Sequence, residues 1–193
     1  MNPIRSALLS VLLLACVAPV ARAQQTAPGV GDAAPAFAAT ADDGQTWRSR
    51  DHVGKSLLVV YFYPAAFTSG CTKQACEFRD HRSQLEELGA QVVAISGDEV
   101  ENLRAFKGSH RLNFPLLSDA DGTIARAFGV PVRSGGVLKS TVDGREVELK
   151  RGVTSARWTF IIGRDGRILY KDTEVDPEGD SRTVIRAIQR LDK

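Results

Sequence analysis

The stretch from residue 57 to residue 63, Leu-Leu-Val-Val-Tyr-Phe-Tyr, constrains the fold of this chain most. It is an unbroken apolar and β-branched run, which is typical of a strand buried on both faces in a parallel sheet. Pro64 ends the run, because proline has no N–H to donate to a sheet ladder. From residue 72 onward the apolar residues fall at helical spacing, and Gly89 is a typical helix end. The sequence therefore predicts a strand, a loop and a helix over 72–88, the start of an α/β fold.

The elements that follow come in an order typical of the thioredoxin-like fold. We expect a central mixed β-sheet flanked by helices, with two strand–helix units in a parallel half and a late hairpin with the final helix in an antiparallel half. Asp98 is expected to cap the second helix. The further predicted helices are 99–107, 121–128 and 178–191, and the further predicted strands are 37–40, 45–47, 91–96, 116–117, 158–162 and 167–171. An extra hairpin is expected near 137–150, where Asp143-Gly144 separates two extended stretches.

Residues 1–23 have the composition of a secretory signal peptide. Arg5 supplies a positive start, an apolar run follows, and Ala21-Arg22-Ala23 is a cleavage signature. A membrane anchor is the alternative, but the apolar run is short for a span that needs about 20 residues. A second alternative is a lipoprotein anchored at Cys16, because residues 13–16 resemble a lipobox. We expect cleavage after Ala23, export to the periplasm, no stable membrane insertion, and one domain over 24–193.

Charge and cysteine content narrow the function classes. The chain has 25 Lys and Arg against 23 Asp and Glu, and cleavage after Ala23 would remove two arginines and leave 23 of each. A net charge this close to zero does not indicate a basic surface that would bind nucleic acid, so no nucleic-acid partner is expected. Of the three cysteines, Cys71 and Cys76 would remain in the mature chain. A pair of cysteines in an exported protein first suggests a structural disulfide, so their spacing matters.

Cys71 stands at the predicted start of a helix, directly after the loop that follows the buried strand. Free N–H groups and the helix dipole place partial positive charge there, which stabilises a thiolate. The thiolate is the nucleophilic form of cysteine. Thr68 lies three residues earlier, where its hydroxyl could face the sulfur or a substrate. This pattern predicts a reactive cysteine.

The chain resembles the peroxiredoxins. The resemblance rests on Pro64, Thr68 and Cys71 in the spacing Pro-x-x-x-Thr-x-x-Cys, on the strand before them, and on Arg157 at the start of a late strand. Cys76, five positions after Cys71, is similar to the Q-type or bacterioferritin comigratory branch. The resemblance covers about residues 30–193.

This resemblance implies a thiol peroxidase that needs no metal or other cofactor. Cys71 would be the peroxidatic cysteine, attacking hydrogen peroxide or an organic hydroperoxide. Thr68 would bind the peroxide and the thiolate, Pro64 would shield the site, and Arg157 would stabilise the thiolate and the developing charge. Cys76 would resolve the oxidised Cys71 as an intramolecular disulfide, and a thioredoxin-like or other dithiol would reduce that disulfide. A monomer is favoured over an oligomer.

The spacing of the two cysteines sets a condition on that disulfide. Five residues along a helix separate Cα atoms by roughly 8–9 Å, whereas a disulfide needs them within about 7 Å. The first turns of the helix must therefore unwind before the bond can form. The alternative is that Cys76 is a small core residue and that Cys71 works with an external thiol.

Two other function classes remain as alternatives. A thioredoxin-type disulfide reductase would carry Cys-x-x-Cys, which is absent from the sequence. A copper-binding assembly factor of the same fold class would use two cysteines and a histidine, but it usually spaces the cysteines by three residues and this chain spaces them by four. We expect His52, His81 and His110 to be surface or helix-face residues. The segment 131–156 does not match the family, and its hairpin could cover the active site or form a contact surface.

Overall fold

The computed structural model describes residues 27–142 and 144–191. The predicted signal peptide, with Cys16, lies outside the described residues, as does Asp143 of the predicted hairpin turn. None of the helices in the described part of the chain is long and apolar enough to cross a membrane.

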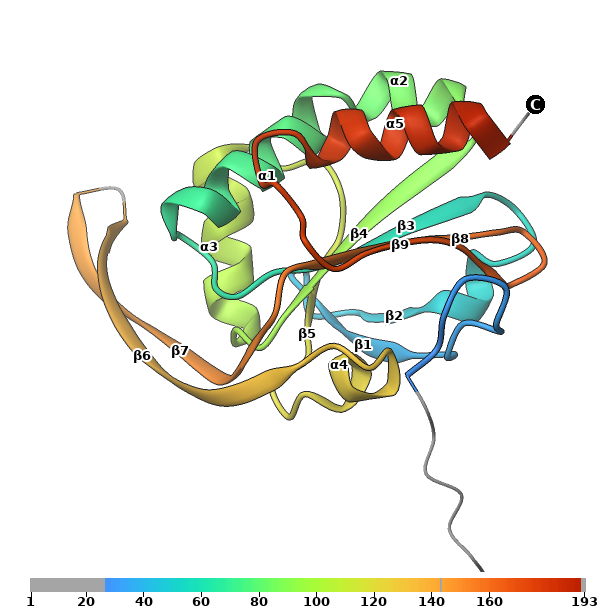
Figure 1. Cartoon of the computed structure of the whole chain (residues 1–193). Coiled ribbons are helices and arrows are strands. Elements are labelled where there is room, and N and C mark those ends of the chain that lie inside the picture. The colour runs from blue at the N-terminus through green and yellow to red at the C-terminus, as the bar shows by residue number, and fades with distance from the viewer. Residues whose placement is uncertain (1–26, 143, 192–193) are drawn as a thin grey trace, which may run out of the picture.

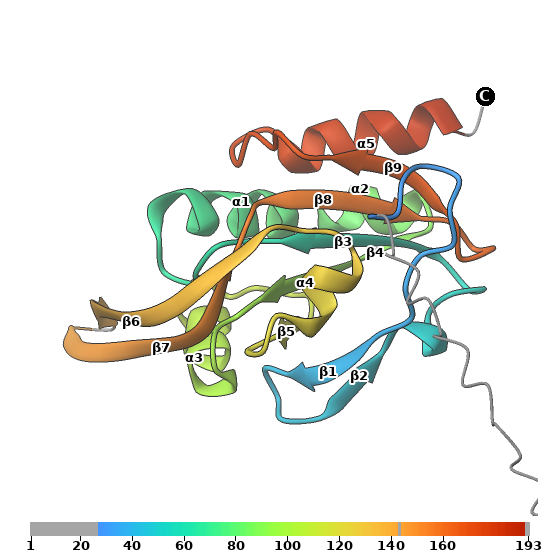
Figure 2. The same cartoon turned by 60° about the horizontal axis from the view of Figure 1, so that its bottom comes forward.

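A seven-stranded mixed sheet forms the centre of the domain (Figures 1 and 2). Its strand order is β2-β1-β5-β4-β3-β8-β9, in which β3, β4 and β5 run parallel and the other neighbours pair antiparallel. The strands of this sheet are β1 (Ala38–Ala41), β2 (Thr46–Arg48), β3 (Leu57–Phe62), β4 (Ala90–Ser96), β5 (Leu116–Ser118), β8 (Trp158–Ile162) and β9 (Ile168–Asp172). The helices are α1 (Ser69–Asp80), α2 (Arg82–Glu87), α3 (Val100–His110), α4 (Thr123–Ala127) and α5 (Asp180–Leu191). The predicted thioredoxin-like α/β architecture is confirmed.

The position of β3 inside the sheet explains why residues 57–63 are apolar without interruption. Val59 and Tyr61 enter one core layer, with side chains from α1, α2, α3 and α5. Val60 and Phe62 enter the other layer, with residues from α4 and from the first strands. Successive side chains of a strand point to opposite faces, so a strand covered on both faces needs apolar residues at every position.

The predicted helix over 72–88 is wrong in one respect, since it is two helices that meet at His81. His81 has φ −94° and ψ 9°, outside the helical range. Its Nδ1 lies 2.9 Å from the carbonyl oxygen of Glu77 and 3.1 Å from Oγ of Ser181, which belongs to α5. Because Ser181 is 100 residues away in the sequence, local spacing could not reveal the break.

The predicted extra hairpin is confirmed and is longer than expected. It consists of β6 (Val132–Val142) and β7 (Arg145–Ser155), which pair with each other and project from the domain as a ribbon (Figure 1). The base of the ribbon is fixed to the domain by a hydrogen bond of 3.0 Å from Gly152 N to Gly97 O. A Cβ atom at position 97 would lie 2.1 Å from the carbonyl oxygen of Val153. Glycine has no Cβ and therefore allows the base of the ribbon to lie this close to residue 97.

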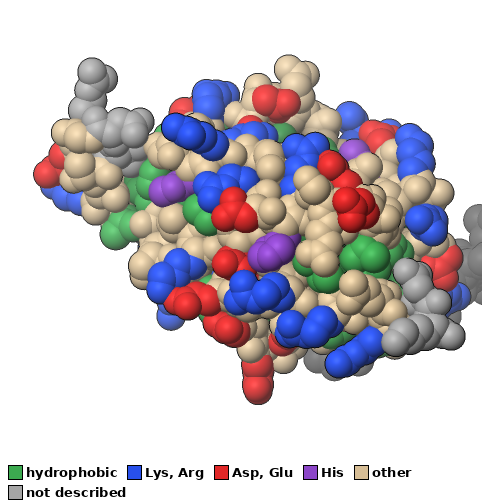
Figure 3. Space-filling view, turned by 90° about the horizontal axis from the view of Figure 1, so that it is seen from above, with side chains coloured by type: hydrophobic (Ala, Val, Ile, Leu, Met, Phe, Trp, Pro, Cys, Tyr) green, Lys and Arg blue, Asp and Glu red, His purple; other side chains and the backbone are tan. Residues whose placement is uncertain are grey.

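The face over α1, α2 and α5 intersperses positive and negative side chains (Figure 3). Ion pairs link α1 to the segment that leads into α5 and to α5 itself: Lys73 with Glu178, and Glu77 with Arg182. These pairs are exposed or half-exposed, so each contributes little stability.

Candidate active site

The β3–β8 pairing brings Cys71 and Arg157 together. Phe62, the last residue of β3, pairs with Trp158, so Arg157 lies opposite the loop that leads from β3 into α1. Cys71 is the third residue of α1 and is 1% exposed. Arg157 Nη2 donates to Cys71 Sγ at 3.3 Å. A guanidinium and a helix N-terminus thus both direct positive charge toward this sulfur.

The loop 64–68 holds its shape through contacts of its own. Thr68 Oγ1 donates to the carbonyl oxygen of Ala65 at 3.0 Å, so this hydroxyl hydrogen is directed to the loop and not to the sulfur. Phe67 has a φ of +62°, a strained backbone conformation for an aromatic residue and one that clusters at functional loops. Pro64 borders a cavity of about 330 Å³ that the base of the ribbon also lines.

Asp98 holds the loop 64–68 in place. The sequence did not predict this role of Asp98. Its carboxylate accepts hydrogen bonds of 2.8 Å from Ala66 N and from Ser96 Oγ. The expectation that Asp98 caps α3 is wrong, because the buried side chain is directed to the loop and Glu99 takes the capping position without a side-chain bond. Burial raises the pKa of Asp98, and the bonds from Ala66 and Ser96 oppose that rise. Its position after β4, next to the end of β3, is the signal that would have indicated this role.

A second buried network lies behind Arg157. Arg157 Nη1 donates to Gln74 Oε1, and Gln74 Nε2 donates to Asp180 Oδ2 at 2.6 Å. Thr159 Oγ1 donates to the same Asp180 oxygen at 2.8 Å. Burial raises the pKa of Asp180 to about 6, although the bonds from Thr159 and Gln74 lower it. Sequence reasoning assigned no role to Gln74, Thr159 or Asp180, because the bonds between them join three separate elements.

Cys71 and Cys76 are both free thiols on one continuous helix. Cys76 is half-buried, one and a half turns after Cys71. Unwinding of this part of α1 would break the bonds that Lys73, Gln74 and Glu77 make to residues in and before α5. These bonds therefore oppose the motion that a disulfide between the two sulfurs requires.

Each of the three histidines makes contacts of its own within the fold. His52 stacks on Trp47 with ring centroids 4.4 Å apart, and its Nδ1 lies 2.8 Å from Gln91 Oε1. His81 belongs to the α1–α2 break, and His110 packs against Phe106. Within residues 27–142 and 144–191, no three His, Cys, Asp or Glu side chains gather where they could hold a metal ion.

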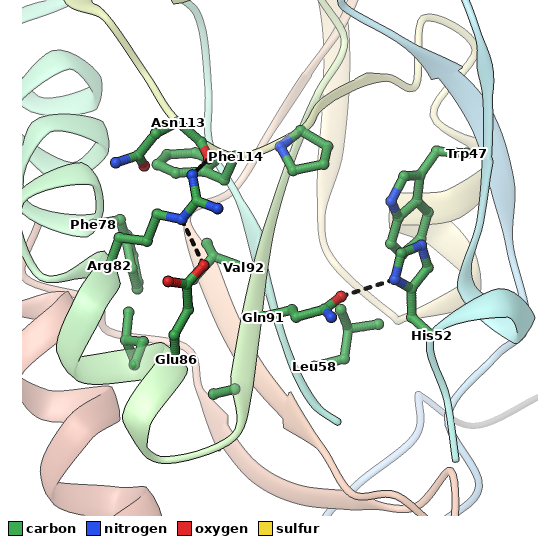
Figure 4. A pocket seen from close by; sticks show the side chains of 13 residues that line it. Trp47, His52, Leu58, Phe78, Arg82, Glu86, Gln91, Val92, Asn113 and Phe114 are labelled. Carbon is green, nitrogen blue, oxygen red and sulfur yellow. Dashed lines mark hydrogen bonds and ion pairs between the residues drawn. The ribbon is translucent and has the colours of Figure 1, made fainter. Parts of the chain in front are cut away.

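A separate cavity of about 190 Å³ opens between α2 and the β2 end of the sheet (Figure 4). Its wall includes the Trp47–His52 stack and the ion pair of Arg82 with Glu86 at 2.7 Å. Leu58, at the start of β3, also lines it, whereas Cys71 follows the other end of that strand. Cys71 does not line this cavity.

Replacing Asp180 by asparagine should change how stability depends on pH. The pKa of Asp180 is raised from 3.8 to about 6 in the folded protein, so the folded state binds this proton more tightly than the unfolded state. The resulting stability is fully present below about pH 4 and is lost as the pH rises through about 6. That loss is about 3 kcal/mol for a shift of about two pKa units, and Asp180→Asn should lack it. Urea unfolding of both proteins across this range measures the difference, and parallel pH profiles would contradict the expectation.

A comparison with protein families finds the AhpC/TSA family, whose model matches residues 30–171. A Mycobacterium tuberculosis protein whose name assigns it to the peroxiredoxins is 40% identical over 149 residues, covering 77% of this chain and 87% of that protein. The chloroplastic peroxiredoxin Q of Populus jackii is 36% identical over 162 residues, covering 83% of this chain and 68% of that protein.

The solved structures give a consistent result. The crystal structure of peroxidoxin BcpB from Mycobacterium tuberculosis superimposes with a TM-score of 0.71 at 32% sequence identity. The match covers 85% of this chain and 98% of that one. The shared architecture extends over nearly all of that protein.

Proposed function

The chain belongs to the AhpC/TSA family as a Q-type peroxiredoxin, a thiol-dependent peroxidase, and from this we propose that it reduces hydrogen peroxide and organic hydroperoxides through Cys71. One observation carries the assignment of Cys71. Its sulfur lies in the first turn of α1 and receives a hydrogen bond of 3.3 Å from Arg157. Cys76 has neither the helix start nor that arginine.

The reaction we assign to this site is a nucleophilic displacement at oxygen. The Cys71 thiolate attacks one peroxide oxygen, a new S–O bond forms and the O–O bond breaks. The sulfur is oxidised to sulfenic acid, and the second oxygen takes up one proton, equivalent to the one that the Cys71 thiol lost on ionising, and leaves as water or an alcohol. Arg157 donors stabilise the negative charge that moves onto the leaving oxygen.

Thr68 and Pro64 complete this proposal. The Thr68 hydroxyl hydrogen is held by Ala65 O, so its oxygen lone pairs are directed elsewhere and can accept a hydrogen bond from the peroxide. Pro64, half-buried and without an N–H, shields the sulfur from water. Both residues lie on the loop that Asp98 fixes through Ala66.

Cys76 is proposed as the resolving cysteine. The Cys76 thiol gives up its proton as its sulfur attacks the Cys71 sulfenic acid. The S–O bond breaks, the hydroxyl group leaves with that proton as water, and a disulfide forms. A thioredoxin-like or other dithiol then returns both cysteines to thiols by disulfide exchange. We further propose that the mature protein begins after Ala23, acts in the periplasm and is a monomer.

Peroxide treatment of the wild-type protein should give an intramolecular Cys71–Cys76 disulfide and a loss of helix signal. Five residues of intact helix hold the Cα atoms roughly 8–9 Å apart, so the bond requires unwinding of α1. Peptide mass spectrometry and circular dichroism after one equivalent of peroxide measure both changes. In Cys76→Ser, sulfenic acid should accumulate and over-oxidise more readily. A persistent sulfenic acid in wild type, or a bridge between chains with Cys76 free, would remove Cys76 from this role.

A further inference from the structure

The buried carboxylate of Asp180 joins three elements behind the reactive sulfur. It begins α5, and its Oδ2 accepts hydrogen bonds from Gln74 of α1 and Thr159 of β8. Asp180 is 2% exposed, and Gln74 and Thr159 are fully buried. The Oδ1 atom has no hydrogen-bond partner among the described residues.

The stability of the folded protein does not by itself explain a carboxylate at position 180. A buried carboxylate with one unpaired oxygen is costly, and an apolar side chain of similar size commonly serves stability better. Among residues 27–142 and 144–191, no Lys, Arg or His forms an ion pair with Asp180. The other titratable groups near Asp180 are Arg157, which contacts the Cys71 sulfur, Tyr61 of β3, and Tyr170 and Asp172 of β9. The position therefore calls for an explanation other than stability.

Asp180 and Arg157 hold the Gln74 amide between them in one orientation. A glutamine amide has an accepting oxygen and a donating nitrogen of nearly equal size, so either end can occupy the same space. A guanidinium can only donate, and an ionised carboxylate can only accept. With Asp180 on one side, the Gln74 nitrogen turns to the carboxylate and the oxygen turns to Arg157 Nη1. Arg157 held in this way presents Nη2 to Cys71 Sγ.

We propose that Asp180 is a positioning residue of the peroxidase reaction, which orients Gln74 and through it aims Arg157 at the sulfur of Cys71. The inference rests on the proposed role of Cys71 and adds a residue that never touches the substrate. Asp180→Ala removes the acceptor that anchors the amide nitrogen of Gln74. Asp180→Asn keeps one accepting oxygen for Gln74 and Thr159 and so preserves that anchor.

The test is the rate of the first peroxide step, measured by stopped flow on the full chain. We expect Asp180→Ala to slow this step about tenfold or more, a part of the loss that removal of a transition-state donor causes. Asp180→Asn should restore the rate to within a few-fold of wild type. In an Arg157→Ala background, Asp180→Ala should cause no further slowing, because a residue that acts through Arg157 has nothing left to position.

The chain offers a matched control in Asp119, a buried carboxylate that accepts N–H bonds from Ile124 and Ala125 at the start of α4. Asp119→Ala should lower the unfolding temperature and leave the peroxide rate unchanged. If Asp180→Ala does not fold, Gln74→Leu breaks the same link and should slow the reaction to a similar extent.

The outcomes separate this inference from the proposed function. If the wild-type protein shows no reaction with peroxide that depends on Cys71, the proposed function itself is wrong. A wild-type rate in Asp180→Ala, or slowing that multiplies with that of Arg157→Ala, would overturn the positioning role and leave the assignment of Cys71 intact. Equal slowing in Asp180→Asn and Asp180→Ala would also overturn it, because the accepting oxygen would then be irrelevant.

Discussion

Cys71→Ser should abolish peroxide reduction while the domain remains folded. Serine is close to cysteine in size and can occupy the buried first turn of α1 without overpacking. Its hydroxyl stays protonated near neutral pH and is a far weaker nucleophile than a thiolate, so the O–O bond is not attacked. Consumption of hydrogen peroxide with a dithiol reductant measures the activity, and circular dichroism with thermal unfolding reports the fold.

Cys76→Ser is the matched control for this prediction. It removes the other thiol from the same helix but leaves Arg157 beside Cys71. The variant should therefore react with peroxide once per chain at a rate close to wild type. Substantial turnover in Cys71→Ser would show that another group carries the reaction.

Arg157→Ala should slow the peroxide step by about 10²–10³, equivalent to about 2.7–4 kcal/mol, the usual cost of losing one donor from a transition state. The guanidinium contacts the sulfur through Nη2 and is held by Gln74 through Nη1. Its loss removes positive charge from both the thiolate and the leaving oxygen. Stopped-flow measurement of the first oxidation, before any reductant acts, isolates this step.

Two further variants test whether the rate depends on the geometry of the Arg157 side chain as well as on its charge. Arg157→Lys keeps the charge but cannot donate to Gln74 and Cys71 from one planar fork, so its rate should lie between wild type and alanine. Arg167→Ala removes an exposed arginine whose hydrogen bond goes to Gly31 O, and its rate should match wild type. If Arg157→Ala also matched wild type, Arg157 would have no part in catalysis.

The features that local sequence pattern controls could be predicted. The apolar run of β3, the turn at Pro64 and the cysteine at a helix start each depend on neighbours in the chain, and the structure places all three as expected. The position of Arg157 next to Cys71 was implied by resemblance alone, because it depends on the β3–β8 pairing between distant segments.

The features that were missed depend on contacts between distant elements. Asp98 looks like a helix cap in the sequence, but its partner is the Ala66 N–H on another loop. Asp180 looks like an ordinary polar residue at a helix start, and only the fold shows that Gln74 reaches it. The ribbon is longer than predicted because its base is held by backbone contacts of Gly97 and Gly152, which have no side-chain pattern to detect.

The role of Cys71 is tested most directly by identifying the sulfur that takes oxygen from the peroxide. Reduced wild-type protein is treated with one equivalent of hydrogen peroxide in the presence of a reagent that traps sulfenic acid, and peptide mass spectrometry then locates the trapped group. We expect the trapped group on Cys71, with the remaining chains carrying the Cys71–Cys76 disulfide. A trapped group on Cys76 with Cys71 still reduced, or no oxidation of either cysteine, would contradict it.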